Sequence, residues 1–204
     1  MIYSMKNLIL ILMFILPSVG FSQRDGSKVM DVNNIDYRLL DSLIIVEINK
    51  VRDSLGNCKM NYSKVVSDNV SKRTCDIMYK EQHVYHPDGR ENLFTEKLES
   101  KIIKESFNSY GNNGGDDVND SFEICLFMMK TYKQVTYGDI ALSIVDLWES
   151  SPDHCFVVRD AYNKKITKTN HEIFIMSGAS TKYGIWNGRN GFYATLNLTV
   201  VYNN

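Results

Sequence analysis

Two short polar clusters, residues 86–92 and 148–154, contain the side chains best suited to chemistry in this chain. Each places a histidine, His86 or His154, at the edge of an apolar segment. Histidine changes its protonation state most readily near neutral pH, and it is also the commonest metal ligand in proteins. If the two clusters meet in the fold, they therefore make a site for a metal ion or for acid–base chemistry.

The chemistry of such a site depends on its acidic partner. Two imidazoles and the carboxylate of Glu91 would make an open zinc site, because zinc accepts His and Glu ligands and can leave one position for water. Without a metal, Glu91 and His154 could form a charge-assisted hydrogen bond that fixes the loop to a helix end. His83 is the alternative to His86 as the loop histidine. His171 lies in a polar segment, which predicts solvent exposure.

A hydrolase would use the same residues differently. His154 or His86 would be the general base. Glu91 would orient that imidazole, and Ser151 or a metal-bound water would be the nucleophile. However, Ser151 lies beside Pro152, where a serine more often caps or turns the chain, and the sequence has no G-x-S-x-G elbow or H-E-x-x-H helix. We therefore assign no catalytic residue and expect a non-catalytic protein.

The N-terminus, residues 1–22, is typical of a secretory signal peptide. Lys6 precedes an almost continuous apolar run, and small residues precede an expected cleavage before Gln23. The run is shorter than the roughly 18 apolar residues of a membrane helix, although an uncleaved anchor is the alternative. We expect a linker over 23–35 and one domain over 36–204, in a secreted or periplasmic protein with no membrane span after cleavage.

Composition limits the partners. The chain has 23 basic and 24 acidic residues, and this balance argues against nucleic-acid binding, which usually requires a basic excess. An even number of cysteines in an exported chain permits two disulfides, with buried free thiols as the alternative. The four cysteines are Cys58, Cys75, Cys125 and Cys155, and their spacings match no paired zinc motif. We expect a monomer.

Hydrophobic periodicity predicts the helices that must position the two clusters. They are expected over residues 36–52, 63–79, 96–106 and 137–149. Ser63 is the expected N-cap of the second helix, and Pro152 ends the last one because the residue before a proline avoids helical geometry. His154 would therefore lie just past a helix C-terminus, where the helix dipole favours the protonated imidazolium.

The strand pattern lies mainly at the end of the chain. Strict alternation predicts a strand over residues 192–202, preceded by a turn at 187–191. Shorter strands are expected at 93–94, 172–176 and 181–186, residues 122–129 fit either a helix or a strand, and 109–120 is expected to be a surface loop. Helices first and an antiparallel hairpin last predict an α+β layered domain.

Several of these landmarks, in this order, resemble the CAP superfamily of secreted proteins, also called SCP-like proteins. Residues 49–52 (N-K-V-R) are similar to the family's N-x-x-R, and residues 90–92 (R-E-N) resemble its G-E-N. Residues 148–154 (W-E-S-S-P-D-H) are similar to the bacterial W-x-x-S-P-x-H, and residues 193–196 (Y-A-T-L) resemble the last strand. The resemblance spans about residues 37–203.

This resemblance implies a three-layer α-β-α sandwich with a small antiparallel sheet of about three strands. Many members have a cavity lined by two histidines and two acidic residues. Carried over by position, the histidines are His86 and His154, and one acid is Glu91. Ser151 stands where eukaryotic members have a glutamate, and bacterial members also have a serine there. Arg90 replaces the glycine of G-E-N.

The expected function is that of an exported, bacterial, non-catalytic CAP domain with a ligand in this cavity. The cavity residues are His86, Glu91, Ser151 and His154, and the metal ligands among them would be the two histidines and Glu91. The ligand would be zinc or another divalent metal, an apolar small molecule or a cell-envelope component. Two alternatives remain: an extracytoplasmic metal- or His-dependent hydrolase, and a surface interaction module that uses residues 109–120 as its contact loop. Residues 97–135 form a longer segment than in compact family members, and no role is assigned to that segment as a whole.

Overall fold

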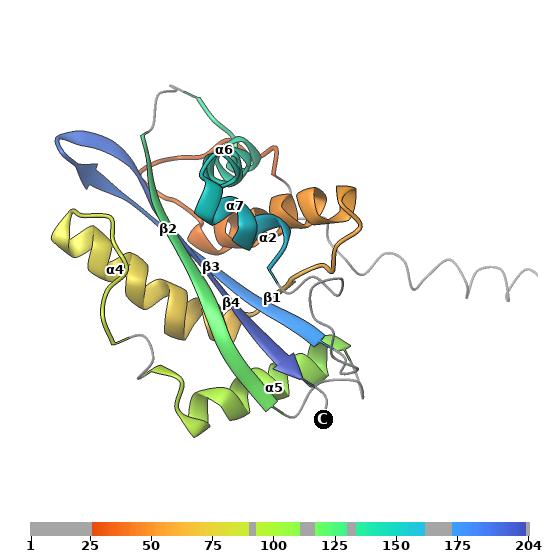
Figure 1. The fold of residues 1–204 in the computed structure, drawn as a ribbon. Coiled ribbons are helices and arrows are strands. Elements are labelled where there is room, and N and C mark those ends of the chain that lie inside the picture. Colours follow the sequence, from red (N-terminus) through yellow and green to blue (C-terminus); the bar gives the residue numbers. More distant parts are fainter. Residues whose placement is uncertain (1–25, 90–92, 111–116, 130–133, 162–172, 203–204) are drawn as a thin grey trace, which may run out of the picture.

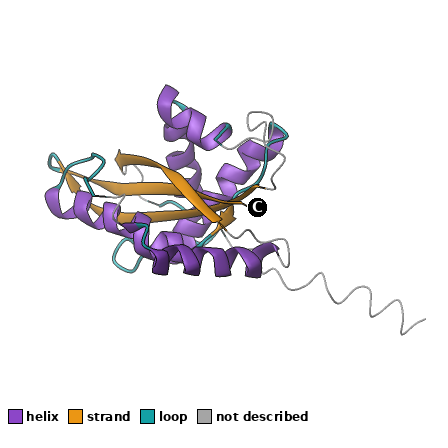
Figure 2. Cartoon of the chain, turned by 60° about the horizontal axis from the view of Figure 1, so that its bottom comes forward, coloured by secondary structure: helices purple, strands orange, loops and turns teal. Residues whose placement is uncertain are grey.

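The computed structural model describes residues 26–89, 93–110, 117–129, 134–161 and 173–202. The predicted signal peptide, Glu91 and His171 lie outside these ranges. Within them, one sheet lies between two layers of helices (Figures 1 and 2). The predicted α+β class and its three-layer arrangement are therefore confirmed.

One face of the sheet is covered by α2 (Tyr37–Ser54), α6 (Tyr137–Glu149) and α7 (Pro152–Arg159) (Figure 1). The Asp36 side chain caps α2 by accepting the Leu39 N–H at 3.0 Å. A capping box of Thr136 and Asp139 begins α6. The first two of these helices match the predicted ranges closely, because caps and apolar stripes agree there.

The opposite face carries a continuous helical segment made of α3 (Lys64–Val66), η2 (Ser67–Ser71) and α4 (Lys72–Glu81). Its predicted N-cap is confirmed, since Ser63 Oγ accepts the Val66 N–H at 3.0 Å. The prediction of one regular helix is wrong, because η2 is a turn of π-helix. Two of its serine hydroxyls donate to carbonyls of a neighbouring strand, and this close contact accompanies the wider helical turn.

A further helix, α5 (Glu96–Tyr110), lies on the same face as α4 and extends beyond its predicted end. Its Leu98 and Ile102 pack against Val66 and Val70. The predicted strand at residues 93–94 is wrong, since Leu93 and Phe94 pack against this same apolar cluster outside any strand.

The sheet has four strands in the order β1-β3-β4-β2: β1 (Asn61–Tyr62), β2 (Asp117–Met129), β3 (Ile173–Trp186) and β4 (Arg189–Tyr202). β2, β4 and β3 are antiparallel, and β1 adds a parallel pairing with β3. The sheet therefore has four strands, whereas about three were predicted. β1 has two residues, too few to show any alternation in the sequence.

The two short strands predicted at 172–176 and 181–186 are one continuous strand, β3. β2 begins at Asp117, inside the segment predicted as a surface loop. The predicted hairpin is confirmed, with Asn187 and Gly188 at positive φ (50° and 74°), as a two-residue type I′ turn requires. None of the helices in the described ranges is both long and apolar enough to span a membrane.

Both faces of the central strand β4 are buried, and successive residues alternate between them. Phe192, Leu196 and Leu198 belong to the core under α2, α6 and α7. Tyr193 packs with Cys75 and Met78 of α4. The same alternation on β2 sends Ile124 and Leu126 to the first core and leaves the intervening odd-numbered residues facing α4.

The expected disulfides are absent, and all four cysteines are free. The two buried thiols have different neighbours on β4. The Cys75 Sγ lies 3.7 Å from the Tyr193 carbonyl, and the Cys125 Sγ lies 4.0 Å from Thr195 Oγ1. Cys75 and Cys125 are buried, whereas Cys58 and Cys155 are partly exposed.

Candidate metal site on strand β2

Two of the residues that could bind a metal come from one strand. Glu123 and Cys125 are two positions apart on β2, so the period of the strand places both side chains on the α4 face. The Glu123 side chain is only 4% exposed, and Cys125 is 5% exposed. A carboxylate and a thiol thus lie together at the edge of an otherwise apolar layer.

The third residue is His86, from the loop after α4. This helix ends at Gln82 in the left-handed conformation (φ 53°), and Gly89 at φ 79° turns the loop again. The Arg73 Nη2 of α4 donates to the Asp88 carbonyl at 3.0 Å, which ties the loop back to the helix. These turns hold His86 over β2.

The three side chains converge on a small volume. The His86 Nδ1 lies 3.1 Å from Glu123 Oε2 and 3.8 Å from the Cys125 Sγ. One atom from each residue can be chosen so that all three lie within 4.8 Å of one another. His86 has 55% of its side chain exposed, so the cluster has a buried side on β2 and an open side toward solvent.

A second layer of hydrogen bonds orients the buried side. Thr74 Oγ1 of α4 donates to Glu123 Oε1 at 2.7 Å, which leaves the other carboxylate oxygen facing His86. Thr195 Oγ1 of β4 lies 4.0 Å from the Cys125 Sγ. Such outer contacts fix the geometry of metal ligands and strengthen binding.

His154 lies in the first turn of α7, not past a helix C-terminus, because Pro152 begins a new helix there. The predicted preference for the protonated ring is therefore wrong. Burial lowers the pKa of His154 below its ordinary value of 6.5, and the charge of His86 lowers this pKa further, partly offset by Asp153. The two histidines of the separate sequence clusters thus act on each other electrostatically.

The N-K-V-R segment of α2 helps to hold α7 in place. The guanidinium of Arg52 is fully buried and donates to three carbonyls, those of Cys58 (2.5 Å), Val158 (3.2 Å) and Ala161 (3.0 Å). Asn49 of the same segment exchanges two hydrogen bonds of 2.8 Å with the backbone of Met60. This segment is therefore structural, and it positions the helix that bears His154.

The other predicted site residues lie elsewhere. Ser151 is the N-cap residue of α7 but makes no side-chain capping bond, and within the described ranges no hydrogen bond joins it to His154. Glu149, which belongs to the same sequence cluster but was not a predicted site residue, pairs with Arg159 at 3.0 Å. His83 lies against the ring of Tyr85, with the ring centroids 5.6 Å apart. Glu91, the predicted acidic ligand, lies outside the described residues.

Glu123 and Cys125 were missed at the level of sequence, where residues 122–129 are one apolar run. The signal that could have found them is the pattern E-x-C, which puts two metal-ligating side chains on one face of a strand. The acidic partner of His86 was expected nearby in the chain, at Glu91. The acid that contacts His86 comes from β2, far along the chain.

The comparisons with known proteins add little. No family model and no curated protein matches the chain. Among solved structures, the chain is similar to an outer surface protein from Borrelia burgdorferi, with 14% sequence identity and a TM-score of 0.42. That similarity covers 77% of this chain and 90% of the other. At these values it supports no inference about function.

Proposed function

We propose that this chain is an exported, non-catalytic ligand-binding domain of the CAP type, and that its ligand is a divalent transition-metal ion such as zinc, held by His86, Glu123 and Cys125. The observation that carries this proposal is the convergence of one imidazole, one carboxylate and one thiol within 4.8 Å. Imidazole, carboxylate and thiolate are the three side-chain groups that zinc binds in proteins.

The separations between the ligand atoms are close to those that a bound metal ion requires. Tetrahedral zinc holds its nitrogen and oxygen ligands roughly 3.4 Å apart, and its nitrogen and sulfur ligands roughly 3.6 Å apart. The His86 Nδ1 has the carboxylate oxygen at 3.1 Å and the sulfur at 3.8 Å. An ion pair between His86 and Glu123 would not need the sulfur on the same nitrogen.

The donor set also limits which metal can bind. A thiolate and an imidazole favour zinc or copper over magnesium and calcium, which prefer oxygen ligands. Three protein ligands leave a fourth position for water or a bound molecule. The charge of His86 lowers the pKa of His154, so the second histidine interacts electrostatically with this ligand.

The CAP assignment is supported by the order of the four sequence motifs and by the α-β-α layers. The resemblance implies a cavity with two histidines and two acids, and Glu123 is the acidic residue beside His86. Export is supported by the pattern of the first 22 residues.

A hydrolase is the second candidate, because an open three-ligand zinc site could activate a water molecule, and His154 interacts electrostatically with the ligand His86. The zinc-loaded protein should not hydrolyse p-nitrophenyl acetate faster than an equal concentration of free zinc. Turnover well above that level, lost in His154→Gln, would replace the non-catalytic proposal with the hydrolase.

Calorimetric titration of zinc into reduced, chelator-treated protein tests metal binding. We expect a dissociation constant in the micromolar range or below, weakened at least about tenfold in His86→Ala, Glu123→Gln and Cys125→Ser. The matched control is His83→Ala, which removes a histidine of the same loop outside the cluster and should bind zinc like the unaltered protein. Equal binding by His83→Ala and His86→Ala variants would overturn the proposed site.

A further inference from the structure

A cavity of about 340 Å³ lies beside β3. In the strand order β1-β3-β4-β2, this is toward the opposite edge of the sheet from β2 and its metal site. Its walls come from the first turns of α2, the π-helical segment η2, the start of α4 and the middle of β3. This volume is at the lower end of the range for small-molecule sites, roughly 300–1,000 Å³. The cavity therefore suits a ligand of about one ring.

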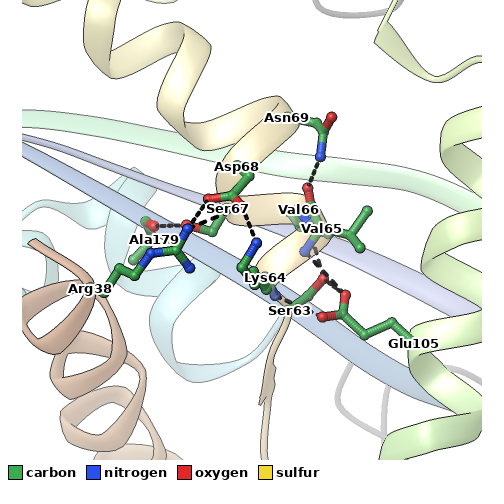
Figure 3. A network of polar contacts seen from close by, with 10 residues as sticks. All are labelled: Arg38, Ser63, Lys64, Val65, Val66, Ser67, Asp68, Asn69, Glu105 and Ala179. Carbon is green, nitrogen blue, oxygen red and sulfur yellow. Dashed lines mark hydrogen bonds and ion pairs between the residues drawn. The ribbon is translucent and has the colours of Figure 1, made fainter.

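The segment η2 is held rigidly at this wall. Ser67 Oγ donates to the Ala179 carbonyl of β3 at 2.7 Å, and Figure 3 shows this contact beside Asp68. The side chain of Glu105 accepts hydrogen bonds from the backbone N–H groups of Lys64 (2.9 Å) and Val65 (3.2 Å), which fixes the start of the same helical segment (Figure 3). The wall is thus anchored to the sheet and to α5.

The most buried ionisable group of the lining is the carboxyl of Asp41, which is 6% exposed. Thr181 Oγ1 donates to its Oδ1 at 2.7 Å. Burial raises the pKa of Asp41 well above its usual range, although hydrogen bonds from Thr181 oppose this rise. In the acid form, which burial favours, this carboxyl can both donate and accept a hydrogen bond.

The cations around the cavity are already paired with carboxylates. Arg38 lies 3.5 Å from Asp68 (Figure 3). Lys72 and Lys182 lie 2.8 Å and 2.6 Å from the two oxygens of Asp76. Each of these three cations therefore has a carboxylate partner, and the two lysines share Asp76.

This pattern excludes three classes of ligand. An anion such as phosphate would have to compete with Asp68 and Asp76 for these cations. A metal cation would compete with the two lysines for Asp76 and with the Thr181 hydroxyl for Asp41. An apolar ligand would cover the partly exposed charged groups of Asp76 and Lys182 without hydrogen-bonding to them, which costs free energy.

We propose that this cavity binds a neutral, hydroxyl-rich small molecule of monosaccharide size, either free or as the terminal ring of a glycan. Each sugar hydroxyl both donates and accepts, so neighbouring hydroxyls can bridge a carboxylate and an ammonium without breaking their pair. The ring of Tyr37, whose hydroxyl accepts the Tyr183 N–H at 3.3 Å, supplies a fixed apolar surface at the wall. This site is separate from the proposed metal site.

Titrations with D-glucose, N-acetyl-D-glucosamine and their methyl glycosides, followed by amide chemical shifts of the chelator-treated protein, test the proposal. We expect saturable shifts at Ser180 and Thr181 with a millimolar dissociation constant for at least one sugar. A methyl glycoside that binds as well as its parent would identify a glycan-linked ring as the source, and a weaker one would identify the free sugar.

Two matched variants distinguish this cavity from general surface binding. Lys182→Met removes a rim cation and leaves Asp76 paired with Lys72, so sugar binding should weaken about tenfold. Lys64→Met removes a cation that pairs with Asp68 at 2.7 Å and leaves Asp68 paired with Arg38. It should bind sugar normally. Equal binding by both variants, or no saturable shift at Ser180 and Thr181 with any of the sugars, would overturn the proposal.

Discussion

The Nδ1 atom of His86 lies 3.1 Å from Oε2 of Glu123, although 37 positions separate the two residues in the chain. One comes from an irregular loop after α4 and the other from the regular strand β2. The loop histidine is mostly exposed and the strand carboxylate is almost fully buried, so the pair lies at the boundary between the solvent and the buried layer under α4. The thiol of Cys125 beside them makes the pair a candidate metal site.

The hydroxyl of Thr74 should raise the zinc affinity of this site by orienting the Glu123 carboxylate. Thr74→Val removes the 2.7 Å hydrogen bond to Glu123 Oε1 but keeps the shape of the side chain. Because outer-layer partners hold metal ligands in place, zinc affinity should fall by about tenfold or more. Calorimetry measures this change, and a Thr74→Ser variant, which keeps the hydroxyl, is the control. If the valine and serine variants bind zinc equally well, the hydroxyl does not orient Glu123.

Arg52 should contribute strongly to stability. Arg52→Met keeps a long side chain but leaves three buried carbonyls without their donor, so the free energy of unfolding should fall by about 3 kcal/mol. Urea unfolding measures the loss. The control is Lys50→Met, which removes an exposed ion pair with Glu47 and should change stability by less than about 0.5 kcal/mol. Similar losses in the two variants would contradict the role given to Arg52.

Gly178 permits the close approach of the π-helical segment to β3. A Cβ atom at this position would lie 2.7 Å from both the Ser67 Cα and the Val66 carbonyl carbon, which are backbone atoms that cannot rotate away. Gly178→Ala should therefore destabilise the protein by about 2 kcal/mol. Gly138→Ala, whose nearest contact would be at 3.1 Å, is expected to cost less. Thermal unfolding compares the two, and equal melting temperatures would show that the segment can shift at little cost.

The depressed pKa of His154 should make the metal-free protein less stable in acid. Between its folded-state pKa and 6.5, the unfolded chain binds more protons than the folded chain, so stability rises with pH through this window and is lost as the pH falls through it. Replacement with glutamine should remove this contribution to the slope of stability against pH.

Proton NMR of the imidazole reports the pKa of His154 directly. It should lie below 6.5 and should rise part of the way back in His86→Ala, because the charge of His86 is one of its causes. A pKa at or above 6.5, or one that His86→Ala leaves unchanged, would contradict this coupling.

Local rules predicted much of the fold. The cap at Ser63, the apolar stripe of α6 and the turn that contains Asn187 and Gly188 all depend on neighbours in sequence, and each is found in the structure. The π-helical turn and the two-residue β1 were not predicted. Both depend on contacts with β3, more than a hundred residues away in the chain, which leave no local periodicity.

The candidate site was only partly predictable, for the same reason. His86 and His154 were selected by residue type, but the partner of His86 is a carboxylate on a distant strand, and a search near the histidine could not reveal it. His154 was predicted to lie past a helix C-terminus, but it lies in the first turn of α7, because Pro152 both ends one helix and begins another. The sequence predicted a favoured imidazolium, whereas burial and the charge of His86 lower the pKa of His154 and disfavour it.

Cobalt substitution tests the central claim most directly, because it reports which atoms bind the metal. The reduced, chelator-treated protein with one equivalent of Co²⁺ should show an intense near-ultraviolet charge-transfer band from the Cys125 thiolate, with visible bands of a low-coordinate ion. The charge-transfer band should vanish in Cys125→Ser and persist in His83→Ala. A spectrum of hexa-aqua cobalt, or a charge-transfer band that survives in Cys125→Ser, would contradict a metal site built from His86, Glu123 and Cys125.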